Sequence, residues 1–143
     1  MDELPIKLEG ILFSKVDGKY EFLILKRTPE DGDFWQPLTG TLKNGEKLED
    51  CLLRELQEET GIQRPINVTD EVWRFDWRKG ENAIIEFVFG VEVDRNSEIT
   101  LSKDEHSEYK WCNFEDAIEM LGRDNNKKAF QEFKRKFLTN EEK

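Results

Sequence analysis

The chain has few of the residues that form disulfides or bind soft metals. Among its 143 residues there are two cysteines, Cys51 and Cys112, and one histidine. Both cysteines lie in segments that we predict to be regular structure, so we expect two buried thiols and no disulfide. The composition also argues against a zinc site, which needs several cysteine or histidine ligands. Free thiols fit a reducing compartment, and we expect a cytoplasmic protein.

Long apolar runs and basic charge are also scarce. No stretch approaches the roughly 20 apolar residues of a membrane span, and residues 1–5 lack the apolar core of a signal peptide. We therefore expect a protein that is neither exported nor embedded in a membrane. The formal net charge of −10 argues against binding of duplex nucleic acid, whose phosphates need a basic surface. A small phosphorylated ligand stays compatible with this charge where metal ions screen it.

Bulky residues are numerous enough to support a folded core. Ten Phe, four Trp and two Tyr accompany an apolar content of 36% and a charged content of 38%, and disordered chains usually lack such aromatic residues. The length suits one domain, and no internal repeat, low-complexity tract or linker marks a second. We predict a single domain over residues 1–143.

Alternating apolar residues predict two antiparallel hairpins. The first joins residues 6–16 and 20–26 through an Asp-Gly-Lys turn. The second has apolar residues at every other position on both sides of a turn at residues 79–82. A shorter strand is expected at residues 109–112. The alternating residues of the second hairpin are Trp73, Phe75 and Trp77 before the turn and Ile85, Phe87, Phe89, Val91 and Val93 after it.

Helical periodicity is clearest over residues 47–60. Leucines recur there at every fourth position, and Gly61 follows as a stop signal. The preceding stretch, residues 28–46, is rich in turn-forming residues and is predicted to be loop. A short helix is expected at residues 114–121 and a final amphipathic helix at residues 126–138. The sequence thus predicts several strands with few helices.

Glutamates are grouped on one face of the predicted helix. Glu55, Glu58 and Glu59 are three and four positions apart, and a helix advances about 100° per residue, so their carboxylates should converge beside the leucine stripe. A cation relieves such crowding of like charges, and an all-oxygen site suits Mg²⁺ or Mn²⁺. The alternative at this point is a solvated acidic face that only aids solubility.

The residues around this helix match a known signature. From Gly40, five residues lead to Glu46, and seven more lead to the run RELQEETGI at residues 54–62. This pattern resembles the Nudix box, G-x5-E-x7-R-E-U-x-E-E-x-G-U with U a bulky aliphatic residue, at every specified position. The resemblance implies an α+β fold: a Nudix-type α/β/α sandwich with a central mixed β-sheet, a loop-helix carrying the box, and a C-terminal amphipathic helix. It also implies a divalent-metal-dependent hydrolase of phosphoanhydride bonds.

The resemblance implies roles for the residues of the box. Glu58 and Glu59 would be the principal ligands of Mg²⁺ or Mn²⁺, and the Gly40 carbonyl would be a further ligand. Glu55 would be a ligand or the base that activates water, and Arg54 would orient it. Hydrolysis at phosphorus needs an oriented water, a base, and cations that neutralise the phosphate oxygens. The acidic helix fits these needs.

Two remaining box positions would shape the structure around the acids. By the same resemblance, Glu46 would brace the loop against the helix. Gly61 would end the helix in a left-handed turn, where a side chain is costly.

Segments outside the box resemble one branch of the family. Residues 34–36 leading into Thr39-Gly40, and residues 105–111, resemble the branch that hydrolyses dihydroneopterin triphosphate and dATP-like nucleotides. In that branch Thr replaces the first glycine of the commoner Gly-Gly pair, as Thr39 does here. The implied reaction is attack of water on a triphosphate, with release of pyrophosphate and a monophosphate.

Five residues outside the box are further candidates. Glu105 is a candidate metal ligand or base from a polar loop, against a plain loop carboxylate. His106 is a candidate for substrate binding or proton transfer, against a structural role in its loop. Trp35 is a candidate for stacking on the substrate ring, although a tryptophan flanked by apolar residues more often anchors the core. Lys26 and Arg27 are candidates for neutralising phosphates, against solvated strand-end charges.

Three other functions stay open. A dinucleoside polyphosphate (diadenosine tetraphosphate) hydrolase is the nearest, but that branch usually has Gly-Gly or Lys-Gly where this chain has Thr39-Gly40. A catalytically silent Nudix module would bind a nucleotide or a protein, although such relatives usually lose one of the box glutamates. The third is an acidic interaction domain without a ligand. The partner we expect is a small nucleotide-like substrate, bound by a monomer or a homodimer.

Overall fold

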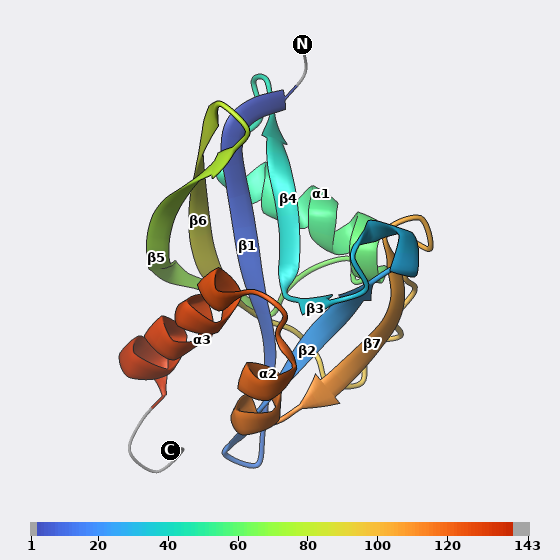
Figure 1. Cartoon of the computed structure of the whole chain (residues 1–143). Coiled ribbons are helices and arrows are strands. Elements are labelled where there is room, and N and C mark those ends of the chain that lie inside the picture. Colours follow the sequence, from blue (N-terminus) through green and yellow to red (C-terminus); the bar gives the residue numbers. More distant parts are fainter. Residues whose placement is uncertain (1–2, 139–143) are drawn as a thin grey trace.

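A seven-stranded mixed sheet forms the centre of the protein (Figure 1). The computed structural model describes the backbone of residues 3–138 and the side chains of residues 5–138; the remaining residues of the predicted 1–143 domain lie outside the described residues. The strands are β1 (Glu3–Val16), β2 (Lys19–Arg27), β3 (Trp35–Gln36), β4 (Leu38–Lys43), β5 (Asn67–Lys79), β6 (Asn82–Glu92) and β7 (His106–Cys112). The helices are α1 (Leu48–Thr60), α2 (Phe114–Met120) and α3 (Asp124–Phe137), with one 3-10 helix, Pro29–Asp31.

Strand β1 organises the sheet because both of its edges are paired. It runs parallel to β6 on one edge, while the other edge is shared by β4 and β2, both antiparallel. The two predicted hairpins, β1–β2 and β5–β6, are confirmed. The parallel pairing of β1 with β6 makes the sheet mixed, as the resemblance implied, and joins segments that are distant in the sequence.

Helices cover both faces of this sheet. Helix α1 packs on one face, where Leu52 and Leu56 join a buried aliphatic cluster. Helices α2 and α3 pack on the other face, where Phe130 and Phe133 join a second, aromatic-rich cluster (Figure 1). These layers confirm the α/β/α sandwich and the C-terminal amphipathic helix. Among the described residues, no helix combines the length and the apolar content that crossing a membrane requires.

The two cysteines lie in different core clusters. Cys51 of α1 is in the aliphatic cluster, and Cys112 of β7 is in the aromatic-rich cluster. Both are free and buried, which confirms the prediction of two buried thiols. Burial raises the pKa of Cys51 to about 12 and that of Cys112 to about 11. Neither thiol is therefore expected to be a reactive thiolate near neutral pH.

The predicted loop over residues 28–46 is wrong in its second half. Residues of this stretch form two strands. Strand β3 pairs with β2, and strand β4 pairs with β1, where Gly10 lies opposite Leu38. The edge of β1 that β2 leaves free supplies hydrogen-bond partners to this segment, and a local pattern cannot reveal such a partner. As a consequence, Thr39 and Gly40 lie on a strand directly beside α1.

Helix α1 ends as its sequence predicted. Gly61 adopts the left-handed conformation with φ 78°, and its backbone N–H donates to the carbonyl of Gln57 at 3.0 Å. A Cβ at this position would also lie 3.2 Å from Cβ of Thr100. Glycine is favoured here because a side chain would strain the backbone and crowd the following loop.

Candidate functional site

Three carboxylates meet on α1. Ligand-capable oxygens of Glu55, Glu58 and Glu59 all lie within 4.8 Å of one another. Side-chain exposure falls from 53% at Glu58 to 12% at Glu55 and 4% at Glu59. The predicted convergence of the three acids is confirmed, and the cluster reaches from the edge of the core to the solvent.

Strand β4 brings Gly40 against this cluster. A Cβ built at Gly40 would lie 2.2 Å from Cγ of Glu55, closer than any real contact, so glycine alone fits. The main chain at Gly40 therefore approaches the carboxylates directly. This position supports the carbonyl ligand that the family resemblance implies.

Arg54 connects the acids to the preceding loop. Its Nε and Nη2 donate to Oε2 and Oε1 of Glu46 at 2.8 and 3.0 Å. Its Nη1 donates to Oε2 of Glu55 at 3.0 Å and to Oε1 of Glu58 at 3.3 Å. The hydrogen bonds from Arg54 lower the pKa of Glu46 to about 2, and the backbone N–H of Lys43 also donates to this carboxylate. Arg54 is thus placed to orient the acids, and Glu46 to brace the loop.

Burial makes the buried members of the cluster hard to ionise in the absence of a cation. Burial is the largest cause that raises the pKa of Glu55 and of Glu59, and repulsion from neighbouring acids adds to it. A hydrogen bond with Glu59, together with burial, raises the pKa of Glu105 to about 7. A divalent cation would favour the ionised carboxylates, and this all-oxygen donor set suits Mg²⁺ or Mn²⁺.

His106 contacts Glu59, the most buried acid of the cluster. Its Nδ1 is 2.9 Å from Oε1 of Glu59, and the residue is 2% exposed. Burial, with a further contribution from Arg27, lowers the pKa of His106 to about 4. The ring is therefore neutral near pH 7 and can donate its Nδ1 hydrogen to Glu59. This arrangement supports the structural alternative, in which His106 holds Glu59 in place.

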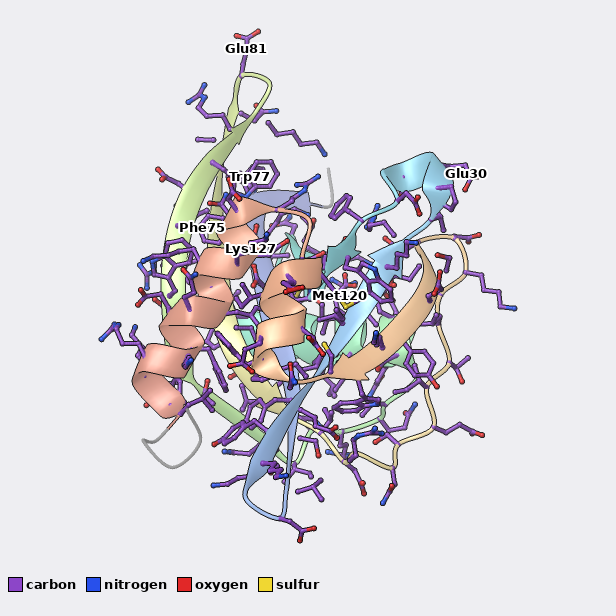
Figure 2. All side chains as sticks on the ribbon, turned by 60° about the horizontal axis from the view of Figure 1, so that its bottom comes forward. Glu30, Phe75, Trp77, Glu81, Met120 and Lys127 are labelled. Atoms are coloured by element: carbon purple, nitrogen blue, oxygen red, sulfur yellow. The ribbon has the colours of Figure 1, made fainter. Side chains whose placement is uncertain are left out.

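A cavity of about 460 Å³ lies on the face of the sheet that carries α3, opposite the face on which α1 packs. Its aromatic lining is Phe34, Phe75 and Trp77, and its basic lining is Lys7, Arg27, Lys79 and Arg123. Figure 2 labels Phe75 and Trp77 on β5 close to the first turns of α3, where Lys127 lies, and Glu30 on the 3-10 helix farther along the sheet. The cavity thus combines flat apolar surfaces with cations.

Two residues link the cavity to the acids of α1. Thr39 lines the cavity and directly precedes Gly40, which touches Glu55. Arg27 also lines the cavity, and its charge acts on Glu59 and Glu105. Strand β4 and Arg27 thus connect the cavity on one face of the sheet with the acids on the other.

Lys26 and Trp35 are not among the described lining residues of the cavity. Nζ of Lys26 lies 3.6 Å from Asp33 and 3.7 Å from Glu108, and 5.9 Å from the centre of the Trp35 ring. Trp35 packs against the aromatic-rich core cluster. This placement supports the core-anchor alternative for Trp35 and the strand-end alternative for Lys26.

The floor of the cavity is polar, and its residues were not predicted from the sequence. Glu86 and Asn126 line it, and Glu9 hydrogen-bonds to Asn126. All three are buried, with exposures of 0% for Glu9, 5% for Glu86 and 6% for Asn126. The sequence offered one signal: Glu9 and Glu86 each interrupt an apolar strand run. Acids at such positions are unusual, because unpaired acids are rarely fully buried.

Comparisons with known proteins agree on one domain type. A family model described as NUDIX domain matches residues 10–139. The bis(5'-nucleosyl)-tetraphosphatase [asymmetrical] of Rattus norvegicus is 34% identical over 127 residues, which cover 85% of this chain and 84% of that protein. The dihydroneopterin triphosphate diphosphatase of Haemophilus influenzae is 29% identical over 124 residues, which cover 78% and 77%.

One relative is much longer than the present chain. The octanoyltransferase of Myxococcus xanthus is 36% identical over 122 residues, which cover 82% of this chain and 33% of that protein. The chain therefore spans about a third of this relative. Among solved structures, the Caenorhabditis elegans Ap4A hydrolase binary complex superimposes with a TM-score of 0.76 at 23% identity, covering 91% of this chain and 95% of that one. This likeness shows a shared fold.

Proposed function

This chain belongs to the Nudix family, and from that premise we propose that it is a divalent-metal-dependent pyrophosphohydrolase acting on a nucleotide-like substrate. One observation carries the proposal: three carboxylates of α1 lie within 4.8 Å of one another, and strand β4 joins them, through Gly40 and Thr39, to a cavity of about 460 Å³ with aromatic and basic lining. Aromatic faces suit a flat heterocycle, and cations suit its phosphates. The acids supply the metal seat that phosphoryl chemistry needs.

The substrate would lie with its ring in the cavity and its phosphates toward α1. Phe34, Phe75 and Trp77 of the lining offer apolar ring faces. Arg27, which lines the cavity and whose charge acts on Glu59 of α1, would neutralise phosphate oxygens between the two regions. This orientation sets the phosphoanhydride bonds near Gly40 and the carboxylates.

Each acid then has a distinct part in the reaction. Glu58 and Glu59, with the carbonyl of Gly40, would hold Mg²⁺ or Mn²⁺, which neutralises charge on the phosphate oxygens and the leaving group. Glu55, oriented by Arg54, would be a further ligand or the base that takes a proton from the attacking water. Glu105 would add an acid from outside the helix. Attack on a triphosphate would release pyrophosphate and a monophosphate.

Two substrate classes are supported by different observations. Thr39 before Gly40 and the Haemophilus influenzae relative favour dihydroneopterin triphosphate or a purine (deoxy)nucleoside triphosphate. The Rattus norvegicus relative favours diadenosine tetraphosphate. The cavity volume of about 460 Å³ lies within the usual range of small-molecule sites.

A substrate panel tests the proposal. We expect Mg²⁺-dependent turnover of dihydroneopterin triphosphate or dATP to pyrophosphate and the monophosphate, measured by chromatography of the products. Faster turnover of diadenosine tetraphosphate would transfer the assignment to the second class. Tight binding of all three compounds without cleavage would support the silent module, and neither binding nor cleavage would contradict the proposal.

A further inference from the structure

The floor of the cavity is rich in hydrogen-bond acceptors. Trp77 Nε1 donates to Oε1 of Glu86 at 3.0 Å, and Asn126 Nδ2 donates to Oε1 of Glu9 at 3.1 Å. Oε2 of Glu9 is fully buried, and no N–H group of the described residues donates to it. An ionised carboxylate oxygen that is buried without a donor is costly, so this position favours a protonated Glu9.

The sheet register places the two acids on the cavity side. Lys7 lines the cavity, and Glu9 lies two residues along β1, so both side chains point to the same face. In the parallel register of β1 and β6, the backbone of Lys7 lies opposite that of Glu86, so the Glu86 side chain points to the same face. Glu9 therefore lies behind Glu86, and a ligand in the cavity meets Glu86 first.

Both acids of this pair are hard to ionise where they are buried. Burial, followed by repulsion from Glu86, raises the pKa of Glu9 well above its usual value. Burial raises the pKa of Glu86 above its usual value as well, and the hydrogen bond from Trp77 and the charges of Lys7 and Arg123 only partly oppose this shift. Because the upward shift is the stronger one at Glu9, a proton favours Glu9 over Glu86. Glu86 then faces the cavity as an acceptor.

We propose that Glu86 selects the ring of the substrate by accepting hydrogen bonds from two adjacent N–H groups, with Glu9 as a positioning residue behind it. The 2-amino-4-oxopyrimidine ring of pterins and guanine presents such an edge, whereas adenine presents one amino group beside a ring-nitrogen acceptor. This inference rests on the proposed function. A carboxylate binds paired N–H donors with charge-assisted hydrogen bonds, and a site built for donors rejects a ring that lacks them because its buried acceptor stays unpaired.

The test compares kcat/KM for dihydroneopterin triphosphate, dGTP and dATP in the wild type and in Glu86→Gln. We expect the wild type to prefer a donor-edge substrate over dATP by at least about tenfold. Glutamine replaces one acceptor oxygen by a donor, so Glu86→Gln should reduce this preference by about tenfold or more. An unchanged ratio would overturn the inference. The two donor-edge substrates distinguish a pterin from a guanine ring.

Two further variants separate ring selection from general damage. Glu9→Gln should reduce the same preference less than Glu86→Gln does, because it acts only through Glu86. Glu92→Gln, on the same strand but away from the cavity lining, should leave the ratio unchanged. A purely structural role would lower turnover of all three substrates in parallel, and that result would contradict ring selection.

A binding measurement covers the case in which Glu86→Gln does not fold. Calorimetric titration of the wild type with dihydroneopterin monophosphate, dGMP and dAMP should show at least about tenfold weaker binding of dAMP, and equal affinities would overturn the inference. The proposed function fails separately, when the wild type cleaves none of the triphosphates in Mg²⁺. Cleavage of all three without preference would reject ring selection alone.

Discussion

Two groups of glutamates lie on opposite sides of the sheet, and their surroundings differ. Glu58 of the α1 group is exposed to solvent and Arg54 bonds two of its acids, so a hydrated cation can reach this group. Glu9 and Glu86 are buried, with exposures of 0% and 5%, and burial raises the pKa of both, so a proton is favoured there over a hydrated cation. The same side chain thus serves two chemistries, because access to water decides whether a metal ion or a proton neutralises it.

The largest expected effect on turnover comes from a substitution in the acidic cluster of α1. Glu58→Gln should lower turnover by about 10²-fold or more with the fold intact, because electrostatic stabilisation of the transition state is lost. Steady-state kinetics and circular dichroism check both parts. Glu49→Gln is the matched control, since Glu49 is an exposed carboxylate in the first turn of the same helix. Near-native turnover in Glu58→Gln would remove Glu58 from the metal site.

Gly40→Ala should have the next largest effect. Its Cβ would fall 2.2 Å from Cγ of Glu55, so Glu55 must move, and we expect turnover to fall by about tenfold or more. Overpacking should also lower the free energy of unfolding by about 1–3 kcal/mol. Gly10→Ala is the control, because its Cβ would meet flexible side-chain atoms at 3.3 Å or beyond. Equal activities of the two variants would show that the close approach at Gly40 is unimportant.

Mg²⁺ should stabilise the folded protein through the acids of α1 and not through Glu9 and Glu86. Ligand at 100 times its Kd raises the free energy of unfolding by about 2.7 kcal/mol, so the wild type should melt several degrees higher in Mg²⁺. Differential scanning fluorimetry should show the same gain in Glu9→Gln and a reduced gain in Glu58→Gln. An equal gain in all three proteins would place the cation away from α1, and no gain in any of them would favour the acidic interaction domain.

The smallest expected effect concerns stability against pH. Folding raises the pKa of Glu9 above its usual 4.5, so the folded state retains a proton that the unfolded state releases, and wild-type stability falls as pH rises above 4.5. Glu9→Gln removes this loss while keeping a donor for Glu86. Its Tm relative to the wild type should therefore increase from pH 4.5 to pH 8, by about 3 °C for about 1 kcal/mol. A pH-independent difference would contradict a protonated Glu9.

Local patterns predicted most of the elements. The periodicity of residues 47–60 and the stop at Gly61 predicted α1 to within one residue, because a helix and its cap involve only near neighbours. Strands β3 and β4 were missed because they are short, Pro37 separates them, and their partners lie elsewhere in the chain. In β6 the alternating apolar residues include Ile85, which is 42% exposed, while Glu86 is buried. Alternation predicted the strand but not which side faces the core.

The sequence by itself determined the acidic cluster of α1, because offsets of three and four residues bring carboxylates together on any helix. Only the tertiary structure decided the floor of the cavity. Glu9 and Asn126 hydrogen-bond across 117 residues of sequence, and Glu86 joins them through the parallel pairing of β1 with β6. Contacts between distant segments depend on how the sheet and its helices pack, and no spacing along the chain encodes them.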